Sequence, residues 1–307
     1  MKKNFCRQVF KSGVGALFLA NIFCVAFASL PVRAFPDDGF SVTAAEPWIK
    51  GKVSVIQEYL HSFVTAMAGK ADELVFIDLF AGNGVYSLGA RKELFANPAL
   101  LSLSMEMPIT KYIFCERDAE QIRALKIRVN KNFRGKNVLL LEGKPEELHS
   151  RFDHYIPRSK GNFKVAVFCL CDSFSLDLKF ETIHYLAQQG VNFLIPFSFA
   201  LNDRLSYRFY LKEHRDKIRR FLNGHEDFDR LEKGVESNAQ FYKRLVQLYQ
   251  NNMLALGYNL SVSSHKANSG LMELPVYQIG FFSKQVSTRT IQHTVEATRH
   301  VQFELFQ

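Results

Sequence analysis

The order of apolar and polar positions along the chain predicts strands that alternate with helices. Between residues 48 and 64, the apolar residues Ile49, Val53 and Ile56 recur at helical spacing. The continuous apolar run 74–80 then indicates a strand that is buried on both faces. Further strands are predicted at 111–116, 138–141, 165–172 and 191–197, with a late pair at 260–264 and 275–282. Helical stretches separate the first five strands, which is typical of a parallel sheet with right-handed crossovers.

Start signals mark the helices between these strands. Asn97 followed by Pro98 predicts a capped helix that runs to residue 105. Asp118, with Gln121 three residues later, is an approximate capping box for a helix to residue 131. Further helices are predicted from about 145, after the fourth strand as far as 189, and at about 203–222 and 236–256. Residues 85–96 are predicted to form a long loop, which is a candidate for a lid or a wall of a substrate site.

The end of the first strand is the strongest candidate for a binding site. Asp78 ends the strand, where ligands of open α/β sheets bind, and Gly82 and Gly84 allow the backbone to approach a ligand closely. Position 87 is serine, so the dinucleotide-binding G-x-G-x-x-G pattern is absent. The pattern D-x-F-A-G-x-G from Asp78 to Gly84 resembles the strand end of S-adenosylmethionine (SAM) methyltransferases. An ordinary buried strand followed by a glycine turn is the alternative interpretation.

SAM offers an amine, a carboxylate, a ribose and an adenine, and acids at consecutive strand ends can bind these groups. An acid that ends the second strand can accept hydrogen bonds from both ribose hydroxyls, and one that ends the third can lie near the adenine. A branched side chain at position 84 is expected to enter the ligand space. The predicted cofactor-binding residues are Asp78, Gly82 and Gly84 for the methionine part, Phe80 in the same turn, Glu116 for the ribose and Glu142 near the adenine. A solvated carboxylate at Glu116 and a simple turn at Glu142 are the alternatives.

The end of the fourth strand carries the candidate catalytic residues, Asp172 and Phe174. Nucleic-acid amino-methyltransferases place an acid or amide there, followed by prolines and an aromatic residue. The acid accepts hydrogen bonds from the target amine, and the aromatic ring stacks the flipped base. Asp172 and Phe174 fit in type, but both prolines are missing. A helix N-cap or a residue of the cofactor pocket is the alternative role for Asp172.

Basic residues recur along the predicted helix at 203–222, and composition limits what they indicate. With spacings of three and four, they project on one face beside an apolar face, so they could contact a phosphate backbone or form a solvated face. The residues are Arg204, Arg208, Lys212, Arg215 and Arg219. The formal net charge is +9, but residues 1–34 hold five bases and no acid, so the rest has 34 bases against 30 acids. The body is only mildly basic, and pI alone says little about nucleic acid.

Length and composition indicate one globular domain behind a separate amino-terminal segment. The 307 residues can form a large α/β domain with additions, and 47% apolar content argues against disorder. Residues 1–34 have the basic start, the apolar stretch and the small residues of a signal peptide or membrane-targeting leader. A cleaved signal, an uncleaved anchor and a mistaken start codon are the alternatives. We divide the chain into this leader, a linker at 35–47 and a methyltransferase-like domain at 48–307.

The cysteines argue against a disulfide framework. Cys6 and Cys24 lie in the leader, which leaves Cys115, Cys169 and Cys171 as small residues of predicted buried strands. No C-x-x-C or H-x-x-x-H spacing occurs, so no metal site is predicted. If the leader is functional, the protein is exported, periplasmic or membrane-anchored, and the leader is its only contact with a membrane. Otherwise it is cytoplasmic.

An ordered set of motifs between Trp48 and Lys284 resembles the three-Cys-motif partner proteins (TcmP). This methyltransferase-like family usually occurs with a separate protein that bears the three-Cys motif. The resemblance therefore implies a class I (Rossmann-like) methyltransferase fold, SAM as cofactor and such a partner, to which the motif cysteines belong. The matching motifs are Trp48 with Lys50 and Lys52, Tyr59-Leu60, Phe76 to Gly84, Phe114 to Asp118, Pro196-Phe197-Ser198, Asn202-Asp203-Arg204 and Val276 to Lys284. The chain departs from the family pattern at Asn83 in the glycine turn, at Ala96-Asn97-Pro98-Ala99, where the family commonly has Gly-Ser-Pro-Leu, and at Asp172-Ser173-Phe174-Ser175, where it has Asp-Pro-aromatic-Gly.

These patterns lead to two hypotheses from different classes. In the first, the protein is a SAM-dependent methyltransferase that acts with a partner on an acceptor, with nucleic acid as one candidate. Methyl transfer would then be in line and driven mainly by positioning. In the second, it is a non-catalytic binding subunit with the same fold, and the missing prolines after Asp172 favour this hypothesis.

Overall fold

A computed structural model describes residues 34–89, 92–270 and 272–304 of the chain. The predicted leader, with Cys6 and Cys24, lies outside the described residues except for Ala34. Among the residues that are described, no helix combines the length and apolar character needed to cross a membrane.

Seven strands in the described part of the chain form the central sheet. The first five in sequence are mutually parallel, and β10 lies antiparallel between β8 and β9. The strands, in spatial order, are β6 (Val138–Glu142), β5 (Lys111–Glu116), β2 (Glu73–Asp78), β7 (Val165–Leu170), β8 (Asn192–Phe197), β10 (Val276–Ser283) and β9 (Asn259–Lys266). This mostly parallel, Rossmann-like sheet with its late antiparallel strand is the one that the sequence predicts, so the predicted fold class is confirmed.

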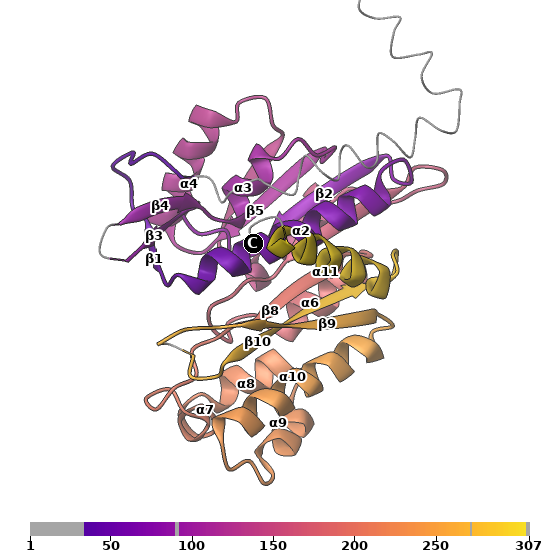
Figure 1. The fold of residues 1–307 in the computed structure, drawn as a ribbon. Helices are drawn as coiled ribbons and strands as arrows, with labels where there is room; N and C mark the ends of the chain where they lie inside the picture. Colours follow the sequence, from indigo (N-terminus) through magenta and orange to yellow (C-terminus); the bar gives the residue numbers. More distant parts are fainter. Residues whose placement is uncertain (1–33, 90–91, 271, 305–307) are drawn as a thin grey trace, which may run out of the picture.

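Helices cover both faces of this sheet (Figure 1). On one face, α2 (Trp48–Met67) packs its Phe63 ring 5.3 Å from Phe168 of β7, and α11 (Thr288–Glu304) packs against α2. On the other face, α10 (Asn238–Ala255) packs Tyr249 5.4 Å from Phe197 of β8. Phe168 and Phe197 lie on opposite faces of the sheet. Phe168 pairs in register with Asn192 of β8, so these two side chains share a face. Phe197 comes five residues after Asn192 and points to the other face, because side chains alternate along a strand. The sheet is therefore buried on both sides, as its apolar runs predict.

Two predicted helix starts are confirmed in their atomic detail. The Asn97 side chain accepts a hydrogen bond from Leu100 N and begins α3 (Pro98–Ser104). The Asp118 carboxylate accepts from Glu120 N and Gln121 N and begins α4 (Ala119–Asn132). Asp118 follows Glu116 at the end of β5, and the Asn97 side chain also donates to Ala81 O in the glycine turn at 2.6 Å. They therefore fix the turns of the candidate site.

The segment 85–96 is not the predicted loop. It forms a hairpin of β3 (Val85–Leu88) and β4 (Glu93–Ala96), with Gly89 at a φ of +56° near its tip. β1 (Thr43–Ala45) pairs in parallel with β3 and completes a small second sheet. These short strands give only a weak sequence signal, because each of them has at most four residues.

Residues 34–47, which contain the predicted linker, pack against the domain, and we call them the strap. Asp38 accepts two hydrogen bonds from Arg128 of α4, each 2.8 Å long, and the Arg128 side chain is only 1% exposed. Arg128 also donates to Asn83 O at 2.7 Å, and the Asn83 side chain donates to Thr43 Oγ1 at 2.9 Å. The strap is therefore joined to the glycine turn after β2.

The predicted helix at 203–222 is two helices. α7 (Tyr207–Glu213) and α8 (Arg215–Leu222) are separated at His214, and α9 (His225–Glu232) follows. The remaining short helices are η2 (Pro145–Glu147), α5 (His149–Tyr155) and α6 (Phe180–Ala187). Helix α8 packs against both α6 and α10, and α8 and α10 lie below β9 and β10 in Figure 1. Because of the break at His214, the basic residues of this region lie on two helices instead of one.

The three cysteines of the described residues are buried and free. Cys169 and Cys171 have their Sγ atoms 3.8 Å apart. Their interpretation as small core residues is confirmed.

Candidate functional site

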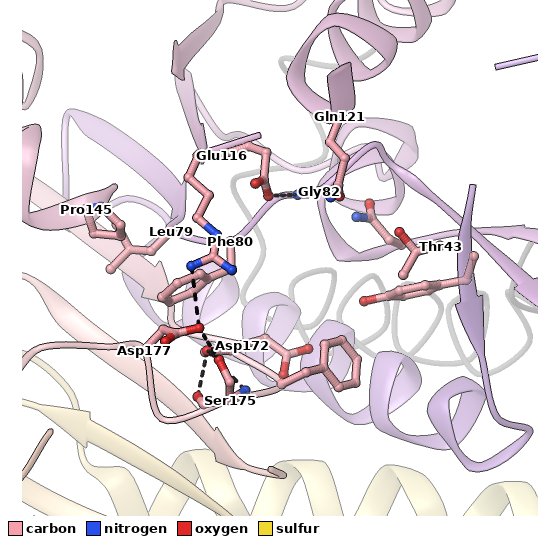
Figure 2. A pocket seen from close by; sticks show the side chains of 15 residues that line it. Thr43, Leu79, Phe80, Gly82, Glu116, Gln121, Pro145, Asp172, Ser175 and Asp177 are labelled. Atoms are coloured by element: carbon pink, nitrogen blue, oxygen red, sulfur yellow. Dashed lines mark hydrogen bonds and ion pairs between the residues drawn. The ribbon is translucent and has the colours of Figure 1, made fainter. Parts of the chain in front are cut away.

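A pocket of about 290 Å³ opens at the carboxyl ends of the central strands (Figure 2). It lies where the chain order of the strands reverses, because β5 and β7 flank β2 on opposite sides. Such switch points are where open α/β sheets bind ligands. Its wall comes from the ends of β2, β5 and β7, the strap and the hairpin. The lining residues are Thr43, Leu79, Phe80, Gly82, Tyr86, Asn97, Glu116, Arg117, Gln121, Pro145, Asp172, Ser173, Phe174, Ser175 and Asp177.

The glycine turn and the end of β5 meet at one side of the pocket. Gly82, with a φ of +58°, donates its N–H to Glu116 Oε2 at 3.0 Å (Figure 2). Glu116 Oε1 accepts from Asp118 N at 2.9 Å. The carboxylate is thereby fixed in orientation, and each of its oxygens keeps further acceptor capacity. Glu116 can therefore bind a ligand hydroxyl without losing its backbone contacts.

Gly84 lies behind the pocket wall rather than on it. A Cβ atom at this position would be 2.7 Å from Leu100 Cδ1 and 3.0 Å from Leu125 Cδ1. The space beside Gly84 is therefore core space that α3 and α4 fill. The expectation that a branched residue at this position enters the ligand space is wrong, because such a residue would meet the core first.

Asp78 is buried behind the pocket. Its Oδ1 accepts a hydrogen bond from Phe80 N at 3.0 Å, and the residue is 2% exposed. Burial raises the pKa of Asp78 from 3.8 to about 8; the Phe80 hydrogen bond opposes this, while the charges of Asp172 and Glu116 add to it. Asp78 can therefore carry a proton near neutral pH.

Asp172 lies on the opposite side of the pocket in a buried ion pair. Its Oδ1 is 2.8 Å from Lys52 Nζ, and Lys52 also donates to Ser198 Oγ at 3.2 Å. The two charged side chains are 4% and 0% exposed. Burial lowers the pKa of Lys52, and the attraction of Asp172 opposes that change. The lysine thus holds the Asp172 carboxylate in place from behind.

Phe174 projects into the pocket with 42% of its surface exposed. Lys52 Nζ lies 3.8 Å from the centre of its ring, and the Tyr86 ring meets it edge-on at 6.3 Å. A cation this close to an aromatic face is attracted by the ring electrons. The ring is therefore supported on one face by Lys52, and part of its surface is left open to the pocket.

The structure brings most of the predicted site residues together. Phe80, Gly82, Glu116, Asp172 and Phe174 all line the pocket. Of the other three, Asp78 lies directly behind it and Gly84 lies in the core. Glu142 pairs in register with Glu116 on the neighbouring strand and is exposed, but it is not one of the lining residues.

Lys52 is a site residue whose chemical role was not predicted from the sequence. The sequence does contain a signal, because position 52 shares the apolar face of α2 with Ile49 and Ile56 at helical spacing. A lysine on a buried helix face requires a partner. Thr43 and Tyr86 were also missed, because their segments were expected to be a linker and a loop.

The predicted basic stripe is divided by the break at His214. Arg215 pairs with Glu232 at 3.1 Å, and Arg219 pairs with Asp216 at 3.2 Å. Lys217, which was not part of that stripe, instead reaches Asp177 at the pocket wall, 2.7 Å away. The bases nearest to the pocket are therefore not those that the sequence pattern selected.

Comparison with known proteins gives distant structural likeness. No protein-family model matches the chain, and no curated protein matches it. The small RNA methyltransferase HEN1 is similar over 75% of this chain, with 14% identity and a TM-score of 0.39, but the chain spans only about a quarter (26%) of HEN1. The METTL16 methyltransferase domain is 11% identical, with 75% of this chain and 82% of that chain covered and a TM-score of 0.42. An rRNA methylase from Streptococcus thermophilus is 11% identical, with 74% and 96% covered and a TM-score of 0.36.

Proposed function

We propose that the protein is a SAM-dependent methyltransferase that binds the cofactor in this pocket and methylates an acceptor beside Asp172. One observation carries the proposal, namely the position of the pocket at the switch point between β2 and β7. The Gly82 backbone and the Glu116 carboxylate line one side of it, and Asp172 and Phe174 line the other. A cofactor and an acceptor would therefore meet between the two sides.

The polar groups of the pocket fit the cofactor. Glu116 Oε2 accepts one hydrogen bond, from Gly82 N, and has capacity for a ribose hydroxyl. Gly82 leaves the backbone open, because the nearest atom to a Cβ at this position would be Gln121 Oε1, 3.5 Å away. A volume of about 290 Å³ is at the lower end of the range for small-molecule sites.

When bound, SAM supplies an activated methyl group. The chain's own contribution is to position the acceptor, which is the main source of rate in such transfers. Asp172 would accept a hydrogen bond from the acceptor and orient it, while Lys52 fixes the carboxylate. The exposed part of Phe174 would pack against a planar acceptor and keep water away from it.

Calorimetry with SAM and with its demethylated product tests the cofactor site. We expect binding to the wild-type protein below millimolar concentration and weaker binding to Glu116→Gln, because a neutral amide accepts ribose hydrogen bonds less strongly. Glu120→Gln is the matched control, since Glu120 is an exposed acid of α4 that does not line the pocket. No binding to the wild type at millimolar cofactor rejects the methyltransferase proposal.

A second candidate function is a non-catalytic binding subunit of the same fold. The low exposure of Asp172 favours it, because only 4% of that side chain is open to an acceptor and Lys52 already occupies Oδ1. Incubation of the protein with methyl-labelled SAM and pooled acceptors distinguishes the two. Any enzyme-dependent incorporation of label excludes the second candidate, whereas cofactor binding without incorporation in any pool supports it.

The proposal includes a separate protein that bears the three-Cys motif, as the family resemblance implies. Co-expression and affinity purification of the two proteins tests this part. A stable complex supports it. Separate elution at micromolar concentration of both proteins contradicts it.

We also propose that residues 1–34 target the protein for export or membrane anchoring. A fusion of residues 1–40 to a reporter that is active only outside the cytoplasm should give signal. A silent reporter, with the full-length protein in the soluble cytoplasmic fraction, would mean that the protein is an ordinary intracellular enzyme.

A further inference from the structure

A second hollow of about 320 Å³ continues from the cofactor pocket and is rich in bases. The two share Phe80, Arg117, Pro145 and Asp177 as lining residues, so they form one connected depression. We call the second hollow the basic groove. Its bases are Arg117, Lys144, Lys179, Lys217 and Arg220.

These bases come from separate parts of the chain. Arg117 follows β5, Lys144 lies in the turn between β6 and η2, and Lys179 precedes α6. Lys217 and Arg220 lie three residues apart on α8, which places both on one side of that helix. The convergence of four segments is not a single solvated helix face. It gathers positive charge at one edge of the pocket.

The acids of the basic groove do not balance its bases. Asp177 is 2.7 Å from Lys217 Nζ and 3.6 Å from Arg117 Nη1, and Glu146 is 2.7 Å from Lys179 Nζ. These are the two acidic residues that line it, against five bases. The groove therefore carries an excess of positive charge.

Two of the bases are available to a ligand. Among the described residues, Lys144 forms an ion pair only with Glu147, at 3.6 Å, in an exposed contact that water screens. Arg220 is exposed and, within the described residues, forms no ion pair with an acid. Phosphates could contact each of these two residues without displacing a buried contact.

A third hollow extends the path away from the cofactor pocket. It shares Lys179 and Arg220 with the basic groove and adds Arg219 and His225, with Glu181 as its one acidic lining residue. Positive charge therefore continues along a line instead of gathering in one cradle. A single small anion would occupy one cradle, whereas a chain of regularly spaced phosphates would follow the line.

We propose that the basic groove binds the phosphate backbone of single-stranded nucleic acid, and that the nucleobases of this strand reach the aromatic side chains at the pocket. The proposal deepens and rests on the methyltransferase function, since it names the class of acceptor. Phe80 and Phe174 line the adjoining pocket, and aromatic side chains next to a basic path are the means by which proteins hold unpaired bases. An acidic protein segment would pair with the basic residues but would leave these aromatic rings without a ligand group to stack on.

Fluorescence anisotropy with labelled single-stranded RNA and DNA oligonucleotides, without cofactor, tests the basic groove. The double variant Lys144→Gln/Arg220→Gln should bind about tenfold more weakly at about 0.15 M salt, because each lost phosphate contact lowers the log–log salt slope by about 0.7. The double variant Lys243→Gln/Arg289→Gln removes the same charge from exposed positions outside the three hollows. It should stay within about twofold of the wild type.

The remaining outcomes separate this inference from the proposed function. Equal binding by both double variants overturns the groove, as does competition by ATP or polyglutamate as effective as that by unlabelled oligonucleotide. Calorimetry with SAM should be unchanged in Lys144→Gln/Arg220→Gln. If SAM binds but oligonucleotides do not, the groove is rejected and the cofactor site stands. If oligonucleotides bind with the expected loss in that variant but SAM does not, the groove stands and the enzyme proposal is rejected.

Discussion

Lys52 Nζ lies 2.8 Å from Asp172 Oδ1, and this ion pair joins helix α2 to the end of strand β7 across 120 positions of sequence. Removing either partner leaves an uncompensated charge in a buried place. The pair lies at the wall of the candidate site, so its two residues affect folding and chemistry together. The effect of a substitution at Asp172 on stability must therefore be measured before its effect on activity is interpreted.

Asp172→Ala should lower the free energy of unfolding by about 3–5 kcal/mol, because the Lys52 ammonium loses its counter-charge. Asp172→Asn should cost less, because its amide oxygen still accepts a hydrogen bond from Lys52. Urea denaturation measures both changes. The double variant Lys52→Met/Asp172→Leu should recover part of the loss, since it removes both charges.

Methyl transfer, once an acceptor is found, should depend on Asp172 more than cofactor binding does. Asp172→Asn should lower turnover while calorimetry with SAM changes little, because the proposed partner of Asp172 is the acceptor. Turnover is compared at equal folded fraction. A folded Asp172→Asn protein with wild-type turnover would move the chemistry to another residue.

The two glycines of the turn should respond differently to the same change. Gly84→Ala places a methyl group 2.7 Å from Leu100 at a φ of +93°, so it should cost stability through both strain and crowding, at least about 1–2 kcal/mol. Gly82→Ala meets no atom closer than 3.5 Å, but it lines the pocket and should weaken cofactor binding more. Thermal unfolding and calorimetry, applied to both variants, measure the contrast. The opposite ranking would show that Gly84 borders the ligand.

The strap should be necessary for the folded domain. Asp38→Ala leaves the buried Arg128 guanidinium unpaired and should cost about 3–5 kcal/mol, which corresponds to roughly 6–20 °C in Tm for a domain of about this size. A chain that begins at residue 35 should keep the wild-type Tm. A chain that begins at Trp48 should melt earlier and lose the Thr43 side of the pocket. Equal Tm values for the two truncations would contradict the role of the strap.

Asp78 should make stability depend on pH. The unfolded chain releases this proton near pH 3.8 and the folded chain near pH 8, so the folded state binds more protons between these values. The stabilising contribution is complete below pH 3.8 and is lost as pH rises through about 8. Asp78→Asn should remove this dependence, and Tm measured from pH 4 to 8.5 in both proteins should show the wild type falling relative to the variant. Parallel curves would mean that Asp78 ionises normally.

The parallel strands of the central sheet could be predicted because each has a nearly continuous apolar run. Strand β5 was predicted with the observed bounds, and β6 and β8 differ by one residue at one end. The hairpin at 85–96 could not be recognised in the same way. Its strands have four residues each, and their burial depends on β1, whose pairing partner lies about 40 residues away.

The site was predicted where local sequence determines it and missed where distant segments meet. Gly82, Glu116 and Asp172 follow directly from strand ends, and each lines the pocket. The partner of Asp172 could not be assigned, because the contact with Lys52 depends on how α2 crosses the sheet. The helix break at His214 was missed because the apolar spacing continues across it, from Leu211 to Ile218.

The contact between Asp38 and Arg128 also has a consequence for biosynthesis. The two residues are 90 positions apart, and at about 5–20 residues per second the ribosome needs roughly 5–18 s to make the second after the first. During that interval the strap has been made without its binding partner, so it cannot yet dock against the domain. A receptor that binds the nascent amino-terminal residues would have those seconds in which to do so, before Arg128 is made and Asp38 can pair with it.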